Sequence, residues 1–125
     1  MRVLIVDDSP TIRKRLQELL APIDGLSVIA EAGDAARALE IARQERPDVT
    51  IVDLSLPEGT GIEVLQGIKA VDPRSVVMVL TNYALDENRR ACLDAGADYF
   101  FDKSNDFDRV PGLLSLLVNM RRLKA

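Results

Sequence analysis

Four apolar runs in the chain are each followed directly by polar side chains that can bind ligands or react. The runs, with the residues that follow them, are Val3–Val6 with Asp7 and Asp8, Val49–Val52 with Asp53, Val76–Leu80 with Thr81, and Tyr99–Phe101 with Asp102 and Lys103. If these runs are neighbouring parallel strands, the polar residues share the carboxyl edge of one sheet. Open α/β sheets bind their ligands at that edge. The pattern therefore constrains the fold and predicts where a functional site lies.

Strand-like and helix-like patterns alternate five times along the chain, which predicts an α/β fold with a parallel sheet. The predicted strands cover residues 3–7, 26–30, 49–53, 76–81 and 98–101, and helical spacing of apolar residues marks 12–20, 34–46, 62–68, 86–95 and 108–122. The strands carry their apolar residues in continuous runs, as expected where helices cover both faces of a sheet, and the most broken run, at 26–30, suits a sheet edge. Right-handed crossovers favour the strand order 2-1-3-4-5. We therefore predict a flavodoxin-like (βα)5 three-layer sandwich, with residues 1–125 forming a single domain.

Composition excludes several classes of protein. The net charge of −4 argues against nonspecific nucleic-acid binding, which needs clustered cations. The absence of histidine excludes hydrolases with Ser-His-Asp or Cys-His centres, histidine-ligated zinc, and any phosphohistidine on this chain. The sequence shows neither an apolar stretch long enough to span a membrane nor a signal-peptide pattern. Together with the single cysteine, Cys92, these features predict a protein of the reducing cytoplasm.

The predicted strand order places the first and third strands side by side, so Asp7, Asp8 and Asp53 are expected within a few ångströms of one another. Two such charges about 5 Å apart repel by about 3 kcal/mol at an effective dielectric constant of about 20. A bound cation or a raised carboxyl pKa would relieve that repulsion. Because the available donors are all oxygen atoms, Mg²⁺ or Mn²⁺ is favoured. Lys103 and Thr81 add a positive charge and a hydroxyl that suit a phosphoryl group, so the set predicts acyl-phosphate chemistry with a carboxylate nucleophile.

Each of these residues also has a simpler structural explanation. Asp7 or Asp8 could cap the first helix, and Asp53 could begin the turn that carries Pro57. A threonine at the end of a strand is ordinary, and a lysine there is usually solvated. The hypothesis of a shared site rests on matching positions at four strand ends, rather than on any single residue.

At these positions the chain resembles the receiver domain of two-component response regulators, of the stand-alone chemotaxis type. The resemblance extends over all 125 residues and rests on Val6–Ser9, Val52–Pro57 with Gly61, Leu80–Thr81, and Gly96–Asp98 leading to Lys103. It implies that Asp53 accepts a phosphoryl group from the phosphohistidine of a sensor histidine kinase or a phosphotransfer protein. It also implies that Asp8, Asp53 and the backbone carbonyl of Ser55 bind Mg²⁺, with Asp7 acting through water.

The resemblance further implies roles for residues on the other side of the site. Thr81 and Lys103 would hold the phosphoryl oxygens, and Thr81 with the aromatic Phe100 would form the conformational switch. Phe100 could instead be an ordinary core residue, since Tyr99 and Phe101 lie beside it. Because a phenylalanine ring lacks a polar tip, we expect Phe100 to point inward even before phosphorylation.

The chain departs from the usual receiver pattern on either side of the predicted site. Ser104 follows Lys103 where a proline is common. A cis bond before a non-proline residue costs about 3–4 kcal/mol, so we predict a trans Lys103–Ser104 peptide. Asn82 stands where a small residue is common, and Tyr83 follows it. We predict that Asn82 and Tyr83 narrow the access of small phosphodonors and water to Asp53.

The helix predicted over 108–122 carries more apolar residues than one buried face needs. Its core stripe consists of Val110, Leu113, Leu114 and Leu117, and the residues that fall to one side are Leu116 and Leu123. This surplus indicates either a partner or homodimer surface or a face that is covered locally. A downstream protein target is expected on the face formed by the helices at 86–95 and 108–122 and the strand between them. Cys92 is expected in the core.

These features together predict a stand-alone receiver without an output domain. It would catalyse only its own phosphorylation and dephosphorylation, and would signal through phosphorylation-dependent protein binding, without touching nucleic acid or membrane. Two alternatives stay open: a truncated receiver from a longer DNA-binding response regulator, and a receiver-like interaction module that is never phosphorylated. An aspartyl-phosphate hydrolase is disfavoured because it needs a second carboxylate where this chain has Ser55. A nucleotide-binding fold is disfavoured because no G-x-x-x-x-G-K-[ST] sequence is present.

Overall fold

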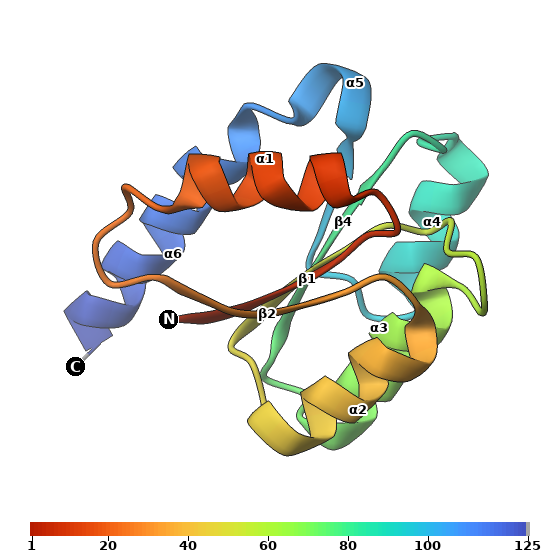
Figure 1. The fold of residues 1–125 in the computed structure, drawn as a ribbon, viewed down its shortest axis with the longest axis horizontal. Helices are drawn as coiled ribbons and strands as arrows, with labels where there is room; N and C mark the ends of the chain where they lie inside the picture. The colour runs from red at the N-terminus through yellow and green to blue at the C-terminus, as the bar shows by residue number, and fades with distance from the viewer. Residues whose placement is uncertain (125) are drawn as a thin grey trace.

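The strands form one parallel sheet at the centre of the molecule. The computed structural model describes residues 1–124, and Figure 1 shows the sheet between two layers of helices. The strands are β1 (Arg2–Val6), β2 (Ser27–Ala32), β3 (Val49–Val52), β4 (Val76–Thr81) and β5 (Tyr99–Asp102), in the order β2-β1-β3-β4-β5. The predicted flavodoxin-like sandwich with strand order 2-1-3-4-5 is confirmed.

Helices cover both faces of this sheet. They are α1 (Pro10–Leu20), α2 (Ala35–Glu45), α3 (Gly61–Val71), α4 (Asp86–Asp94), α5 (Lys103–Asp106) and α6 (Arg109–Lys124). The α1–α6 layer packs on one face through Leu16 and Leu114 among others. The layer of α2, α3 and α4 packs on the other through residues that include Ala38, Val64 and Cys92. Cys92 is fully buried, as predicted. Within the described residues, no helix combines the length and the apolar character that crossing a membrane requires.

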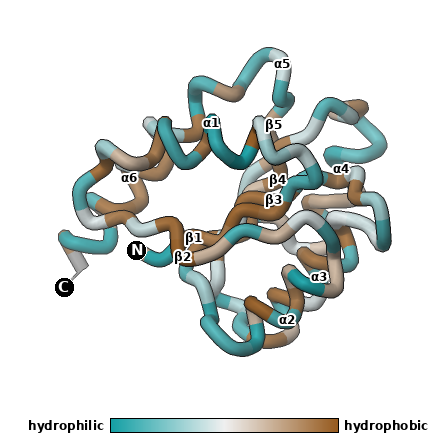
Figure 2. The backbone as a smooth tube through the Cα atoms, viewed as in Figure 1, coloured by the Kyte–Doolittle hydropathy of each residue, from teal (hydrophilic) through white to brown (hydrophobic). Residues whose placement is uncertain are grey.

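Successive residues of a strand point to opposite layers, so burial of both sides supplies much of the driving force for folding. In β1, Val3 and Ile5 contact the α1–α6 layer, whereas Leu4 and Val6 contact the opposite layer. None of these four residues is more than 1% exposed. Figure 2 shows the hydrophobic colouring concentrated on the central strands. The alternation explains why most strand residues are apolar on both sides of the sheet.

Local sequence fixes the segments that follow β1 and β3. Ser9 caps α1 by accepting a hydrogen bond from the helix backbone at 3.2 Å, and Pro10 occupies the first helical position. After β3, the amide of Gly61 donates to the carbonyl of Leu54 at 3.0 Å. A Cβ atom at Gly61 would overlap the carbonyl oxygen of Asp53, so the chain can close there only with glycine. The loop that leaves Asp53 is held in place by this contact.

The strand β2 is longer than the sequence pattern indicates. The prediction gives residues 26–30, whereas the structure places β2 at Ser27–Ala32. Its pairing with β1 continues to Ala32, which lies opposite Val6. Glu31 lies within this strand and accepts a hydrogen bond from Arg13 of α1 at 3.1 Å. A charged residue with a partner on the neighbouring helix therefore extends this edge strand beyond the point where the apolar pattern stops.

The prediction also places no helix between residues 101 and 108, where the structure has the short α5. Asp102 caps this turn by accepting a hydrogen bond from the Ser104 amide at 2.8 Å. The carboxylate of Asp106 accepts one from the Asp102 amide at 3.0 Å. The described residues contain no cis peptide bond, so Lys103–Ser104 is trans, as predicted. The long helix α6 then begins at Arg109.

Candidate functional site

The carboxyl edge of the sheet brings the three predicted carboxylates together. Val6 pairs with Val52 at the ends of β1 and β3, and the amide of Asp53 donates to the carbonyl of Val6 at 3.0 Å. One carboxylate oxygen from each of Asp7, Asp8 and Asp53 lies within 4.8 Å of the others. Asp7 and Asp53 are buried, at 3% and 7% exposure, whereas Asp8 is exposed. The cluster thus has two enclosed members and one that faces solvent.

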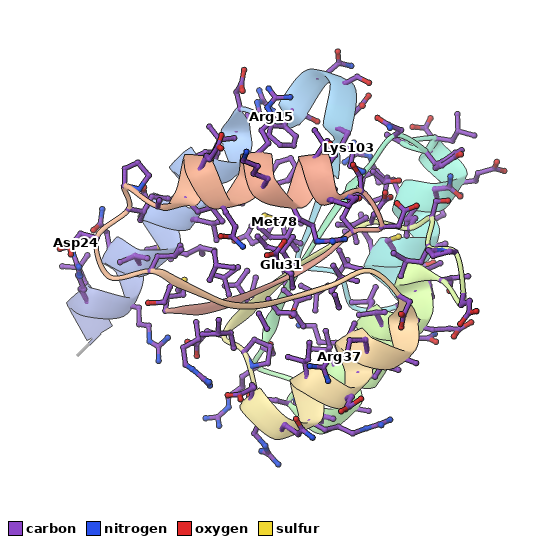
Figure 3. The ribbon with its side chains drawn as sticks, in the orientation of Figure 1. Arg15, Asp24, Glu31, Arg37, Met78 and Lys103 are labelled. Atoms are coloured by element: carbon purple, nitrogen blue, oxygen red, sulfur yellow. The ribbon has the colours of Figure 1, made fainter. Side chains whose placement is uncertain are left out.

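Lys103 bridges the two buried carboxylates. Its Nζ lies 2.7 Å from Asp7 Oδ2 and 2.8 Å from Asp53 Oδ2, and its side chain is only 8% exposed. In Figure 3, Lys103 lies at the end of the sheet where α1 begins. Burial works to lower the pKa of Lys103, but the hydrogen bonds and charges of Asp53 and Asp7 outweigh it and raise that pKa above its ordinary value. Lys103 therefore stays charged at neutral pH, beside the predicted nucleophile.

The second oxygen of each buried carboxylate belongs to a local turn. Asp7 Oδ1 accepts a hydrogen bond from the Ser9 amide at 2.9 Å. Asp53 Oδ1 accepts one from the Ser55 amide at 3.3 Å. The turn explanation is thus correct for one oxygen of Asp53. The explanation of Asp7 as the cap of the first helix is wrong, because Ser9 caps α1 and Asp7 only accepts from the Ser9 amide before the helix begins. The other oxygen of each faces Lys103, so one carboxylate carries both roles.

The carboxylate cluster fits a divalent cation that prefers oxygen ligands. Asp8 has neither a hydrogen bond nor an ion pair to another described residue, so its carboxylate is available at the open side of the cluster. Ser55 lies close by in the β3–α3 loop and pairs with Thr60 across a single bridge. Three carboxylates, one of them in contact with solvent, match the demand of Mg²⁺ for a few carboxylate ligands with water in its remaining positions. Asp8, Asp53 and the Ser55 carbonyl remain the predicted ligands.

Thr81 and its two successors line the other side of the edge. Thr81 ends β4, is fully buried, and its Oγ1 accepts a hydrogen bond from the Tyr83 amide at 3.2 Å. Asn82 is exposed, and Tyr83 is 58% exposed. Tyr83 lines a shallow hollow together with Leu54, Ser55 and residues of α3 and α4. The arrangement puts Tyr83 beside the loop that leaves Asp53, while a control of access by Asn82 and Tyr83 stays a prediction.

Phe100 points inward, as predicted for a ring without a polar tip. It is 6% exposed and packs in the layer of α2, α3 and α4. The guanidinium carbon of Arg89 on α4 lies 4.8 Å from the centre of the ring, within the range of a cation–π contact. Tyr99 and Phe101 point to the opposite layer. Phe100 is thus a core residue in this structure, and its role as a switch stays a prediction.

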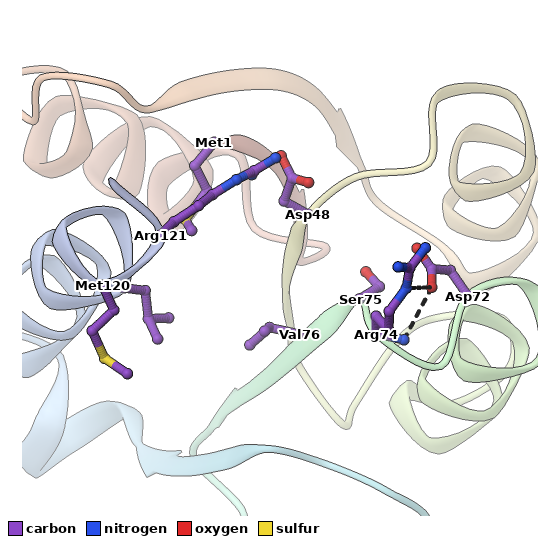
Figure 4. Close-up of a pocket in the computed structure, with 9 residues that line it drawn as sticks. Met1, Asp48, Asp72, Arg74, Ser75, Val76, Met120 and Arg121 are labelled. Atoms are coloured by element: carbon purple, nitrogen blue, oxygen red, sulfur yellow. Dashed lines mark hydrogen bonds and ion pairs between the residues drawn. The ribbon is translucent and has the colours of Figure 1, made fainter. Parts of the chain in front are cut away.

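A hollow at the opposite edge of the sheet lies away from the carboxylates. It has a volume of about 480 Å³ and is lined by residues that include Asp48, Ser75 and Arg121. Figure 4 shows the guanidinium of Arg121 reaching toward Asp48, and the ion pair measures 2.9 Å. Charges of both signs are already paired there. The strand-end cluster, although it is not a deep cavity, is the place where reactive groups converge.

Arg13 contacts this site and is absent from the predicted set. Its Nη1 donates to the backbone carbonyl of Asp7 at 2.5 Å. Arg13 lies six positions after Asp7, on α1, and the strand-end pattern carries no information about helix residues. Every residue has a backbone carbonyl, so the residue types in the sequence do not indicate which carbonyl an arginine contacts.

The fold and the site define a class of protein: an α/β sandwich in which an acidic cluster and a lysine meet at the carboxyl edge of a parallel sheet. The chain belongs to the family of response regulator receiver domains, whose model matches residues 3–114. It is therefore a receiver domain of two-component signalling, a family in which phosphorylation of the domain and Mg²⁺ binding at an acidic pocket are typical.

Individual relatives support this assignment. The chain is 35% identical over 103 residues to the DNA-binding transcriptional activator DevR/DosR of Mycobacterium tuberculosis, covering 82% of this chain and 48% of the relative. The response regulator domain of Thermotoga maritima CheB superposes with a TM-score of 0.84 at 27% identity, over 96% of this chain and 94% of that one. A chain of the CheX–CheY–BeF3–Mg²⁺ complex from Borrelia burgdorferi superposes with a TM-score of 0.79 at 26% identity, over 91% of this chain and 89% of that one. The chain spans about half the length of the first curated relatives it matches.

Proposed function

We propose that Asp53 accepts a phosphoryl group from the phosphohistidine of a sensor histidine kinase or a phosphotransfer protein, in a reaction that requires Mg²⁺. The observation that carries the proposal is the position of Lys103 Nζ, 2.8 Å from Asp53 Oδ2 and 2.7 Å from Asp7 Oδ2. A cation held there neutralises charge next to the nucleophile, where charge builds up during phosphoryl transfer.

The transfer joins a carboxylate oxygen of Asp53 to phosphorus while the bond from phosphorus to the donor imidazole nitrogen breaks. The imidazole leaves with the bonding electron pair. Asp8, Asp53 and the Ser55 carbonyl would hold Mg²⁺ (Mn²⁺ is a possible substitute), with Asp7 acting through water. The metal supplies charge neutralisation and orientation for the phosphoryl oxygens. Lys103 and the hydroxyl of Thr81 supply further positive charge and a donor on the other side.

The effect of phosphorylation is proposed to be a change in protein binding. Thr81 and Phe100 form the proposed switch, which couples the site to the face made by α4, β5 and α6. This face carries exposed apolar residues, among them Leu93, Leu116 and Met120. We place the downstream protein target there, with a homodimer as another occupant. The net charge of −4 supports a domain that itself does not bind nucleic acid or an anionic membrane surface. The proposed location is the cytoplasm.

A second candidate function is control of a separate DNA-binding domain in a longer regulator. The relatives favour it, because the chain aligns with about half the length of each of two proteins that are described as a transcriptional regulator and a transcriptional activator. The features of residues 1–125 fit both functions equally, since the phosphoacceptor site and the switch would serve either output. The stand-alone receiver and the regulatory segment therefore differ in what the α4–β5–α6 face contacts.

The test of the phosphoacceptor is intact-mass spectrometry after incubation with Mg²⁺ and a small acyl phosphate. We expect the wild-type chain to gain one phosphoryl group, and the Asp53→Asn variant and a sample treated with a chelator to gain none. Because Asn82 and Tyr83 are proposed to restrict small donors, binding of beryllium fluoride with Mg²⁺ is measured in parallel. A wild-type chain that takes up neither the phosphoryl group nor the fluoride would contradict the proposal.

A further inference from the structure

Arg13 makes two contacts that the proposed phosphoryl transfer does not explain. Nη1 donates to the carbonyl of Asp7 at 2.5 Å, and Nε donates to Glu31 Oε1 at 3.1 Å. The side chain is 21% exposed, so most of it is removed from water. Figure 3 shows Glu31 between β2 and α1. The guanidinium therefore ties the first turns of α1 both to an edge strand and to the end of β1.

The carbonyl that Arg13 holds belongs to the peptide unit between Asp7 and Asp8. This unit is planar, so an anchored oxygen fixes the orientation of the plane and of the Asp8 amide. The Asp7 side of the unit is fixed as well, because the Asp7 amide donates to the Ala32 carbonyl at 3.0 Å. The exposed carboxylate of Asp8 has no partner of its own among the described residues. The backbone that Arg13 anchors therefore fixes where the Asp8 side chain leaves the chain, and with only two side-chain torsions this limits where its carboxylate can lie.

We propose that Arg13 is a positioning residue for divalent-cation binding, which holds the Asp7–Asp8 peptide so that the Asp8 carboxylate is directed toward Asp53. This inference rests on the proposed function, in which Asp8 and Asp53 are ligands of Mg²⁺. Arg13 itself does not contact the cation. Anchoring groups behind metal ligands typically change metal affinity by about 10–100-fold when they are removed.

The positive charge of Arg13 acts in the opposite direction. A guanidinium near the carboxylates repels Mg²⁺, so its removal alone would tighten binding. Glu31 reduces this repulsion, since it pairs with Arg13 and also accepts a hydrogen bond from Gln17. Anchoring and charge therefore predict opposite changes in Mg²⁺ affinity when Arg13 is replaced. A measured affinity decides between them.

The experiment compares Mg²⁺ dissociation constants, measured by calorimetry on the full chain, for the wild type and three variants. Arg13→Met removes the anchor and the charge. Arg13→Lys keeps the positive charge but lacks the planar guanidinium group, whose separate N–H donors reach two acceptors at once. Lys14→Met is the matched control, because exposed Lys14 carries the same charge on the same helix. Amide spectra of each variant report whether the fold is intact and whether the Asp8 resonance moves.

We expect the dissociation constant for Mg²⁺ to rise about tenfold in Arg13→Met and severalfold in Arg13→Lys, while Lys14→Met stays close to the wild type. Should Arg13→Met fail to fold, Arg13→Lys decides the question, because a pure charge effect predicts no change in it. Wild-type affinity or tighter binding in a folded Arg13 variant would overturn the inference. Failure of the wild type to bind Mg²⁺ would instead overturn the proposed function, so the two failures are distinguishable.

Discussion

Lys103 and Asp53, fifty positions apart in the chain, form an ion pair of 2.8 Å in which each side chain is 8% exposed. The same ammonium serves Asp7 at 2.7 Å, so one cation balances two buried carboxylates. Because the pKa of Lys103 is raised from its ordinary value of 10.5, this stabilisation is fully present below pH 10.5 and is lost as the pH rises through the raised pKa. Lys103 therefore links the stability of the domain to its proposed chemistry.

Replacement of Lys103 by Met should destabilise the chain at neutral pH by about 3 kcal/mol, because it leaves two buried carboxylates without a compensating positive charge. Mg²⁺ should restore part of the loss, since a divalent cation binds the same carboxylates in the folded state only. Urea unfolding of Lys103→Met with and without Mg²⁺ measures both effects. This role of Lys103 is contradicted if Lys103→Met is as stable as the wild type, or if Mg²⁺ stabilises neither the variant nor the wild type.

Acid should weaken the contribution of Asp48, at the opposite edge of the sheet, to the stability of the folded chain. Burial works to raise the pKa of Asp48, but hydrogen bonds from the Arg2 amide and from Arg121 outweigh it and lower that pKa from 3.8. A lowered pKa gives stability that is present above pH 3.8 and is lost as the pH falls through the folded-state value. Asp48→Asn should therefore be less stable than the wild type at neutral pH, with the gap closing below pH 3.8. Denaturant titrations of both proteins across this pH range measure the difference in stability. Asp24→Asn is the control, because the Asp24 side chain is 95% exposed. A stability difference that persists in acid would refute the lowered pKa of Asp48.

Replacement of Asn82 by Ala should speed the loss of the phosphoryl group from Asp53. Asn82 is exposed beside Thr81, and removal of its side chain opens a path for water to the acyl phosphate. The rate of dephosphorylation, followed by intact mass after removal of the donor, should rise severalfold. Asn119→Ala, which removes the same side chain from an exposed position on α6, is the control and should leave the rate nearly unchanged. An unchanged or slower rate in Asn82→Ala would remove the access hypothesis.

A charge on the exposed apolar stripe of α6 should disrupt the proposed contact with a partner or a second copy. Leu116, Met120 and Leu123 are 54%, 46% and 88% exposed and recur at helical spacing. Leu116→Glu should shift a dimer toward monomer in size-exclusion chromatography, or weaken binding of the downstream target, whereas Asn119→Glu places the same charge elsewhere on α6 and should not. Identical elution and target binding of Leu116→Glu and wild type would count against this surface.

Most of the fold follows from simple patterns in the sequence. The apolar runs predict the strands, because a sheet between two helical layers buries both of its faces. The right-handedness of crossover connections then limits the possible strand orders. The end of β2 and the turn α5 do not follow in this way. These features involve individual polar contacts, which the apolar periodicity does not report: Arg13 donates to Glu31, and the Ser104 amide donates to Asp102.

The site was predictable to the extent that it consists of strand-end side chains. Asp7, Asp8, Asp53 and Lys103 meet at one edge because their strands are neighbours or near neighbours in the sheet. The contact of Arg13 with the Asp7 carbonyl could not be predicted, since it joins a helix side chain to a backbone atom. Sequence patterns report residue types at regular spacing, whereas such a contact depends on the precise entry angle of α1.

The most direct test is a crystal structure of the chain with Mg²⁺ and beryllium fluoride. We predict one Mg²⁺ bound by Asp8, Asp53 and the Ser55 carbonyl at about 2.1 Å, and a BeF3 group joined through beryllium to an Asp53 carboxylate oxygen, with its fluorine atoms in contact with Lys103 and Thr81. A metal bound away from these carboxylates, or a BeF3 group on any residue other than Asp53, would contradict this prediction.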